Sequence, residues 1–226
     1  PESVGFYVSG QLLTEEYYIA NKLMKGFIGC NNIDTNSRLC MSSAVAAYKK
    51  TLGDDAVPIS YEDIEQTNCF FIAGANPAWC HPILYRRIEK RKAEAPDTKI
   101  IVVDPRRTES CELADLHLQL RPGTDVLLYN AIARLIIDNG WHDPEFIQEH
   151  VDGFDALQAQ LRDVSIEDTA QVTGVPREEI ELAAEWLGRS ESFLTLWAMG
   201  LNQSAAGVDK NLALLNLSLI TGKIGK

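Results

Sequence analysis

Four short apolar runs, each followed closely by Gly or Asp, constrain the fold more than any other feature of this sequence. They comprise residues 68–73, 99–103, 116–120 and 193–197. Apolar runs of this length, bounded by turn residues, are typical of strands buried on both faces. Stretches with helical periodicity separate them. The pattern therefore predicts an α/β fold, with helices covering both faces of a parallel sheet.

The remaining elements follow from periodicity and from breaks at Gly and Pro. One further strand is expected at residues 5–8, and residues 30–39 are expected to form a polar loop. The segment 143–188 is expected to be helical and polar. Individual helices are expected at 14–27, 42–51, 82–94, 125–137 and 211–220.

These elements predict two Rossmann-like parallel-sheet units with flanking helices, one inserted in the other. Residues 56–189 are expected to form the inserted dinucleotide-binding unit. The two flanks, 1–55 plus 190–226, are expected to meet as a discontinuous α/β unit that carries Cys40. The chain starts without Met and ends in a Gly-rich connection, so we expect it to be an internal fragment of a longer protein.

Charge and hydropathy exclude two classes of partner. The net charge of −11 argues against a nucleic-acid surface, which needs clustered Lys and Arg. No apolar run approaches the length of a membrane span, and the N-terminal residues lack the order of a signal peptide. The five cysteines are widely spaced, without a CxxC pair. A reducing, cytoplasmic location is therefore expected.

Ligands of open α/β sheets bind beyond the carboxyl ends of the strands, where this sequence places polar and turn residues. The turn at Gly74–Pro77 suits close approach to a phosphate. Asp104 is a candidate acceptor for a ribose hydroxyl, and Asp125 for the adjacent N–H donors of a guanine edge. Arg106 is a candidate for phosphate binding or base stacking. Taken singly, each of these residues is explained as well by an ordinary turn or helix cap.

Cys40 lies between an Asn-rich loop and a predicted helix. The positive end of that helix and the neighbouring Arg38 favour the thiolate form, which binds soft metals. A single cysteine is nevertheless more often a small buried apolar residue. The four histidines show no metal-ligand spacing.

Taken together and in order, six segments resemble the large prokaryotic molybdopterin oxidoreductases, and among them the nitrate reductases of the assimilatory and periplasmic type. The resemblance extends over essentially the whole chain. The six segments are 9–11, 36–41, 74–77, 104–108, 123–125 and 199–203.

This resemblance implies a bis-molybdopterin guanine dinucleotide cofactor, with its molybdenum held by two dithiolenes and the thiolate of Cys40. Cys40 and Met41 are the implied catalytic residues. The implied cofactor-binding residues are Gln11, Asn36, Ala73, Gly74, Ala75, Asn76, Pro77, Ala78, Trp79, Cys80, Asp104, Pro105, Arg106, Arg107, Thr108, Gly123, Thr124, Asp125, Met199 and Gln203.

The implied reaction is reduction of nitrate to nitrite by oxygen-atom transfer, with electrons from a donor protein or domain. Met41 follows Cys40, whereas formate dehydrogenases of this family carry His at that place. The family also has a 4Fe–4S cluster held by closely spaced cysteines, and neither this group nor the C-terminal domain is found in this chain. The chain alone is thus not expected to be active. The alternatives are a formate dehydrogenase or other oxidoreductase on the same cofactor, and a nucleotide-binding α/β module without metal chemistry.

Overall fold

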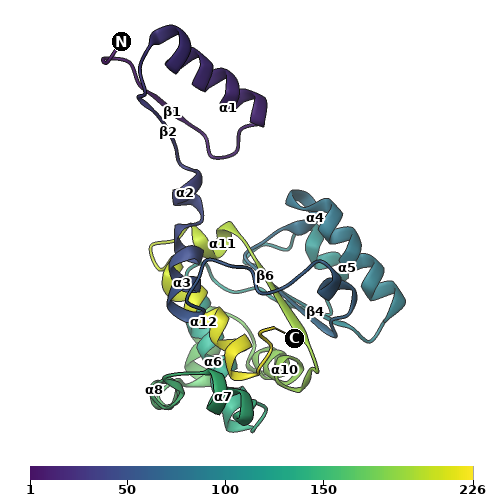
Figure 1. The fold of residues 1–226 in the computed structure, drawn as a ribbon. Helices are drawn as coiled ribbons and strands as arrows, with labels where there is room; N and C mark the ends of the chain where they lie inside the picture. Colours follow the sequence, from purple (N-terminus) through teal and green to yellow (C-terminus); the bar gives the residue numbers. More distant parts are fainter. Residues whose placement is uncertain (226) are drawn as a thin grey trace.

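The computed structural model describes residues 1–225, and its main sheet has four parallel strands in the order β5-β4-β3-β6 (Figure 1). All four strands lie within the apolar runs that predicted them. They are β3 (Cys69–Ala73), β4 (Lys99–Val103), β5 (Leu116–Leu118) and β6 (Phe193–Trp197). The predicted α/β class with parallel sheets flanked by helices is therefore confirmed.

Both faces of the main sheet are buried. Phe71 and Ile101 pack on one face against α6 (Asp125–Asp138), α10 (Arg177–Arg189) and α12 (Gly207–Ile220). Their neighbours in the strands face the opposite way, because side chains alternate along a strand. On that second face Phe70 and Ile100 pack against α5 (Pro82–Glu94). Each fully buried aromatic or aliphatic side chain of this kind contributes about 1.5–3 kcal/mol to folding.

The other helices surround this sheet, and most of them agree with the predicted positions. The helix predicted at 211–220 begins earlier, at Gly207. No helix within residues 1–225 is long and apolar enough to cross a membrane. The remaining helices of the main unit are α3 (Ser42–Thr51), η2 (Glu62–Glu65), α4 (Pro77–Cys80), η3 (Glu109–Leu113), α7 (Pro144–His150), α8 (Phe154–Leu161), α9 (Ile166–Thr173) and α11 (Met199–Asn202).

A small N-terminal unit projects from the main sheet, drawn in purple in Figure 1. Its two strands, β1 (Phe6–Val8) and β2 (Ile33–Thr35), are parallel. Between them α1 (Thr14–Asn21) continues into a π-helix, η1 (Lys22–Ile28), and α2 (Ser37–Cys40) leads into the main unit. The prediction of a loop over residues 30–39 was thus wrong, because pairing with β1 stabilises a strand too short and polar to be recognised alone.

The last strand of the chain, β6, joins the main sheet, while the predicted division into 1–55 plus 190–226 and 56–189 stays a prediction. Strand β6 pairs with β3 over its whole length, from Phe193 opposite Cys69 to Trp197 opposite Ala73. It therefore belongs to the sheet of the middle segment and not to a sheet shared with residues 1–55. The two flanks do meet, since α3 packs against α12. Strand β6 is drawn into the main sheet because the free edge of β3 otherwise leaves buried backbone groups without hydrogen bonds.

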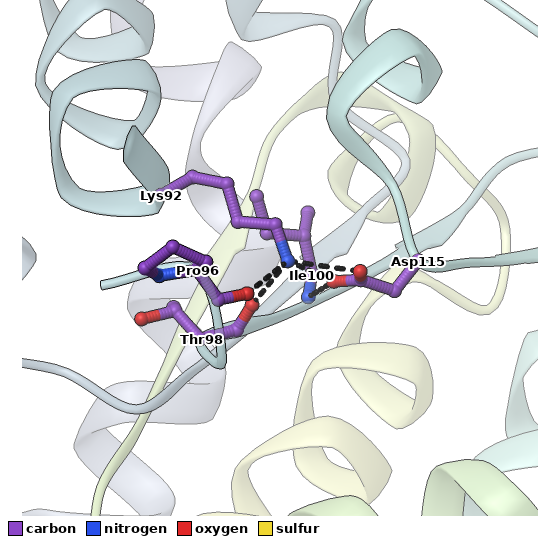
Figure 2. Close-up of polar contacts among 5 residues, drawn as sticks. All are labelled: Lys92, Pro96, Thr98, Ile100 and Asp115. Atoms are coloured by element: carbon purple, nitrogen blue, oxygen red, sulfur yellow. Dashed lines mark hydrogen bonds and ion pairs between the residues drawn. The ribbon is translucent and has the colours of Figure 1, made fainter. Parts of the chain in front are cut away.

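At the amino ends of the strands, Lys92 of α5 joins three segments (Figure 2). Its Nζ donates to the backbone oxygens of Pro96 and Thr98 at 3.1 and 2.6 Å, and lies 2.9 Å from both carboxylate oxygens of Asp115. Asp115 in turn accepts from the backbone N–H of Ile100 at 2.8 Å. This network connects α5 to the start of β4 and of β5, at the end of the sheet opposite the carboxyl ends of the strands.

Candidate functional site

The carboxyl ends of the four parallel strands lie together along one side of the main sheet, here called the strand-end edge. Most of the predicted site residues follow those strand ends. β3, β4 and β5 succeed one another in one direction, whereas β6 returns to the other side of β3. The order of the strands therefore reverses between β3 and β6. In open α/β sheets this reversal opens a crevice that binds ligands.

The turns after β3 and β6 cross in close contact at this reversal. The backbone N–H of Gly200 donates to the carbonyl oxygen of Gly74 at 3.0 Å. A Cβ built on Gly200 lies only 2.6 Å from the Cα of Gly74, and Gly74 has a φ of +55°. Neither residue can carry a side chain without a shift of the backbone. The predicted turn at Gly74 is thus present, and its glycine is required by packing.

Cys40 lies at the end of α2, two residues before the start of α3, and its side chain is partly exposed. The side-chain amide of Gln203 donates to Cys40 Sγ at 3.4 Å. The amide of Asn202 lies 3.5 Å from Met41 Sδ, and Ser43 Oγ donates to the Asn202 carbonyl at 2.9 Å. The segment after β6 therefore contacts the predicted metal ligand and the residue beside it.

Gln11 and Asn36 lie on the N-terminal side of Cys40. The backbone N–H of Gly10 donates to Asn36 Oδ1 at 2.5 Å, which holds the end of β1 against the start of α2. Gln11 is exposed, and its backbone N–H donates to Ser9 Oγ at 3.2 Å. Both predicted residues thus lie where β1 meets the start of α2, the short helix that ends at Cys40.

The turn after β3 and the one after β4 share a hydrogen-bond network. Ser110 Oγ donates to Asn76 Oδ1 at 2.7 Å and accepts from the backbone N–H of Ala78 at 3.1 Å. Two buried polar atoms remain without a partner, Asn76 Nδ2 and Thr108 Oγ1. Such orphaned groups are unusual in a folded protein, and here both belong to residues predicted to bind the cofactor. The residues therefore fit a polar ligand at this edge.

Asp104 and Arg106 follow β4, and their neighbours fix their positions. Asp104 Oδ1 accepts from the backbone N–H of Arg106 at 2.8 Å, and the Asp104 carbonyl lies 2.9 Å from His117 Nε2. The guanidinium of Arg106 lies over the ring of Trp79, 5.5 Å from its centroid. Both of these side chains are exposed, so they offer a flat cationic surface to solvent at the strand ends.

Asp125, the predicted acceptor for a guanine edge, already has a charged partner within the chain. It starts α6 and is buried, and its Oδ2 lies 2.7 Å from Lys210 Nζ of α12. Before it, Gly123 forms a turn with open space around it, and Thr124 Oγ1 donates to the Arg121 carbonyl at 2.7 Å. One carboxylate oxygen is therefore already engaged within the chain.

Tyr129, one turn along α6, lies near the carboxylates of Asp125 and Asp104. Its side chain is fully buried, and its hydroxyl has no partner. Burial, reinforced by the charges of Asp125 and Asp104, raises the pKa of Tyr129 well above its ordinary value. The phenol therefore stays neutral behind the strand ends.

Four residues of this region were not predicted from the sequence. Lys210 is a charged residue at the start of a helix that is mostly apolar, and that contrast was an available signal. The contacts of the others depend on pairings between distant segments. The unpredicted residues are Ser110, Asn202, Lys210 and Asn211.

The described residues include no group of three or more His, Cys, Asp or Glu side chains able to hold a metal ion. Cys40 is the protein ligand that the resemblance implies, with the other metal ligands coming from the cofactor, and this stays a prediction.

A family model described as molybdopterin oxidoreductase matches residues 1–226. The chain belongs to this family. Nitrate reductases of Synechocystis sp. and of Klebsiella oxytoca are each 47% identical to it, over 97% and 100% of this chain. The chain spans 31% and 26% of those relatives.

Other members of the family are also similar to this chain. The alpha subunit of the F420-dependent formate dehydrogenase 1 of Methanococcus maripaludis is 37% identical over 100% of this chain and 33% of its own length. Among solved structures, the acetylene hydratase of Pelobacter acetylenicus aligns with a TM-score of 0.75 and 25% identity. That alignment covers 92% of this chain and 28% of the hydratase. The family fold therefore serves more than one reaction.

Proposed function

We propose that this chain is the cofactor-binding part of a molybdenum nitrate reductase, which reduces nitrate to nitrite by oxygen-atom transfer. The observation that carries the proposal is the position of Cys40, partly exposed and in contact with Gln203 from the end of β6. Identity of 47% to the two nitrate reductases supports this substrate. The reaction belongs to the full-length protein.

The cofactor proposed for the strand-end edge is molybdopterin guanine dinucleotide, present as two copies around one molybdenum. Once bound, it supplies the open metal position and the electrons for the reaction. Cys40 is the proposed protein ligand. The turn that follows β3, from Gly74 to Pro77, is the proposed place where a phosphate group approaches the backbone. The orphaned Asn76 Nδ2 is a donor suited to the same group.

Arg106 over Trp79 provides a cationic, planar surface for a phosphate or a base. Electrons are proposed to arrive through a 4Fe–4S cluster elsewhere in the full-length protein, from a donor protein or domain. The proposed location is the cytoplasm.

The test is elemental analysis of the full-length protein, with Cys40→Ala beside the unmodified protein and a dye-linked nitrate assay in parallel. The expected result is about one molybdenum per chain and nitrate turnover in the unmodified protein. Both fall steeply in Cys40→Ala. Cys30→Ala is a matched control, since this thiol is partly exposed like that of Cys40 and is not among the predicted site residues. A fully matured protein without molybdenum contradicts the proposal and favours a nucleotide-binding module.

Formate oxidation is the second candidate, because a formate dehydrogenase is 37% identical over the whole chain. Met41 favours nitrate over formate, since a thioether cannot relay the proton released from formate. Assays of the unmodified protein with both substrates separate the two, and Met41→His tests the role of the residue. Oxidation of formate without reduction of nitrate by the unmodified protein would overturn the nitrate assignment.

A further inference from the structure

A buried ion pair lies directly behind the strand-end edge. Lys210, in the first turn of α12, is 5% exposed, and its Nζ lies 2.7 Å from Asp125 Oδ2. Lysine is almost never buried to this extent without a partner, because an isolated ammonium loses its hydration there. The pair therefore joins α12 to the first residue of α6.

The two oxygens of Asp125 have different surroundings. Oδ2 is held by Lys210, whereas no described residue donates a hydrogen bond to Oδ1. Oδ1 is also not one of the polar atoms that are buried without a hydrogen-bond partner. One oxygen is thus fixed from the interior, and the other remains available to a donor at the edge of the sheet.

The same ammonium also reaches the turn after β6. Lys210 Nζ lies 3.5 Å from the carbonyl oxygen of Gly200, whose N–H donates to the carbonyl of Gly74. Lys210 therefore contacts both the start of α6 and the crossing of the two turns. A side chain in this place orients the carboxylate relative to the ligand crevice.

We propose that Lys210 is a positioning residue that holds Asp125 Oδ2 so that Oδ1 receives the two adjacent N–H donors of a guanine base. Adenine presents an unprotonated ring nitrogen at the corresponding edge, which repels a carboxylate. The Lys210–Asp125 pair thereby selects guanine over adenine. This inference rests on the proposed function, because it assumes a nucleotide-containing cofactor at this edge.

The test measures binding of guanosine and adenosine monophosphate to the cofactor-free full-length protein by calorimetry. The unmodified protein is expected to bind the guanine nucleotide at least about tenfold more tightly, the scale of one charge-assisted hydrogen bond. Lys210→Met is expected to lose most of that preference through weaker guanine binding, with adenine binding unchanged. Lys210→Arg restores part of the preference. Lys49→Met, an exposed lysine of α3, is the matched control.

Two outcomes overturn the inference. One is an unchanged guanine-to-adenine ratio in folded Lys210→Met, and the other is an equal loss for both nucleotides. Lys210→Met leaves the buried carboxylate of Asp125 without its partner charge, which can prevent folding. In that case the double variant Lys210→Met with Asp125→Asn removes this unpaired charge as well. That double variant is expected to fold and to bind both nucleotides alike, so a retained guanine preference also overturns the inference.

The nucleotide measurement is independent of the metal, which separates this inference from the proposed function. Molybdenum and nitrate turnover in an unmodified protein that shows no guanine preference overturn the role of Lys210 alone. An unmodified protein that prefers guanine but lacks molybdenum and nitrate turnover contradicts the proposed reaction while supporting the role of Lys210.

Discussion

The side-chain amide of Gln203 donates to the thiol sulfur of Cys40 across 3.4 Å, although 163 residues separate the two in the sequence. Gln203 directly follows α11, the short helix after β6, and Cys40 is the last residue of α2. This one contact connects the main sheet to the segment that leads from the N-terminal unit. Hydrogen bonds to a ligand sulfur reduce its electron donation to a bound metal, and so raise the reduction potential.

Replacing Gln203 by Leu tests that relationship. The variant loses the N–H donor, so the midpoint potential of the bound metal is expected to fall by about 60 mV for a one-electron step, equivalent to a hydrogen bond of about 1.4 kcal/mol. Redox titration followed by electron paramagnetic resonance measures the shift. Gln160→Leu, at an exposed position on α8, is the control. An unchanged potential in Gln203→Leu means that the contact has no electronic role.

Adding a methyl group at the crossing of the two turns is expected to destabilise the main unit. The Cβ of Gly200→Ala lies 2.6 Å from the Cα of Gly74, so backbone must move, at a cost of about 2 kcal/mol or more. Urea unfolding measures the loss. Gly26→Ala, where the nearest atom is 4.0 Å away, is expected to be tolerated. Equal stability of the two variants argues against a close crossing.

Removing the ammonium of Lys92 is expected to weaken the opposite edge of the sheet (Figure 2). Lys92→Met leaves two backbone carbonyls and the carboxylate of Asp115 without their donor, and the expected loss of stability is about 1–3 kcal/mol. Lys90→Met removes an exposed lysine on the same helix, paired with Glu94 at 3.8 Å, and is expected to change stability by less than about 0.5 kcal/mol. Similar losses in both variants would rule out a special role for Lys92.

Alkaline pH is expected to destabilise the protein through Cys69. Burial raises the pKa of this thiol from 9.0 to about 12. Between these values the unfolded chain releases the proton and the folded chain retains it, so stability falls as pH rises from about 9 to 12, by up to about 4 kcal/mol.

Urea unfolding at several pH values between 8 and 11 measures this loss. Cys69→Ala is expected to flatten the alkaline decline, whereas Cys80→Ala, at an exposed position, leaves it in place. Burial likewise raises the pKa of Tyr48 and of Tyr85 to about 12, so a decline remains in Cys69→Ala. A decline as steep in Cys69→Ala as in the unmodified protein contradicts the assignment to this thiol.

The local pattern of residues was enough to predict the strands of the main sheet and the polar residues that follow them. Apolar runs such as 99–103 must be buried on both faces, and Asp104 must then follow the end of a strand, because these properties depend on neighbouring residues alone. Cys40 was also found in this way, before the start of α3. Its role as metal ligand, and the contacts of the predicted cofactor-binding residues with a cofactor, remain predictions.

Which segments lie side by side depends on the packing of the whole chain and could not be predicted from local patterns. The pairing of β6 with β3, the short strand β2 and the ion pair between Lys210 and Asp125 each join residues far apart in the chain. The free energy of such a contact depends on burial and on a partner that the local sequence does not contain. An apolar strand fits any sheet with a free edge, and the packing of the whole chain selects the edge of β3 for β6.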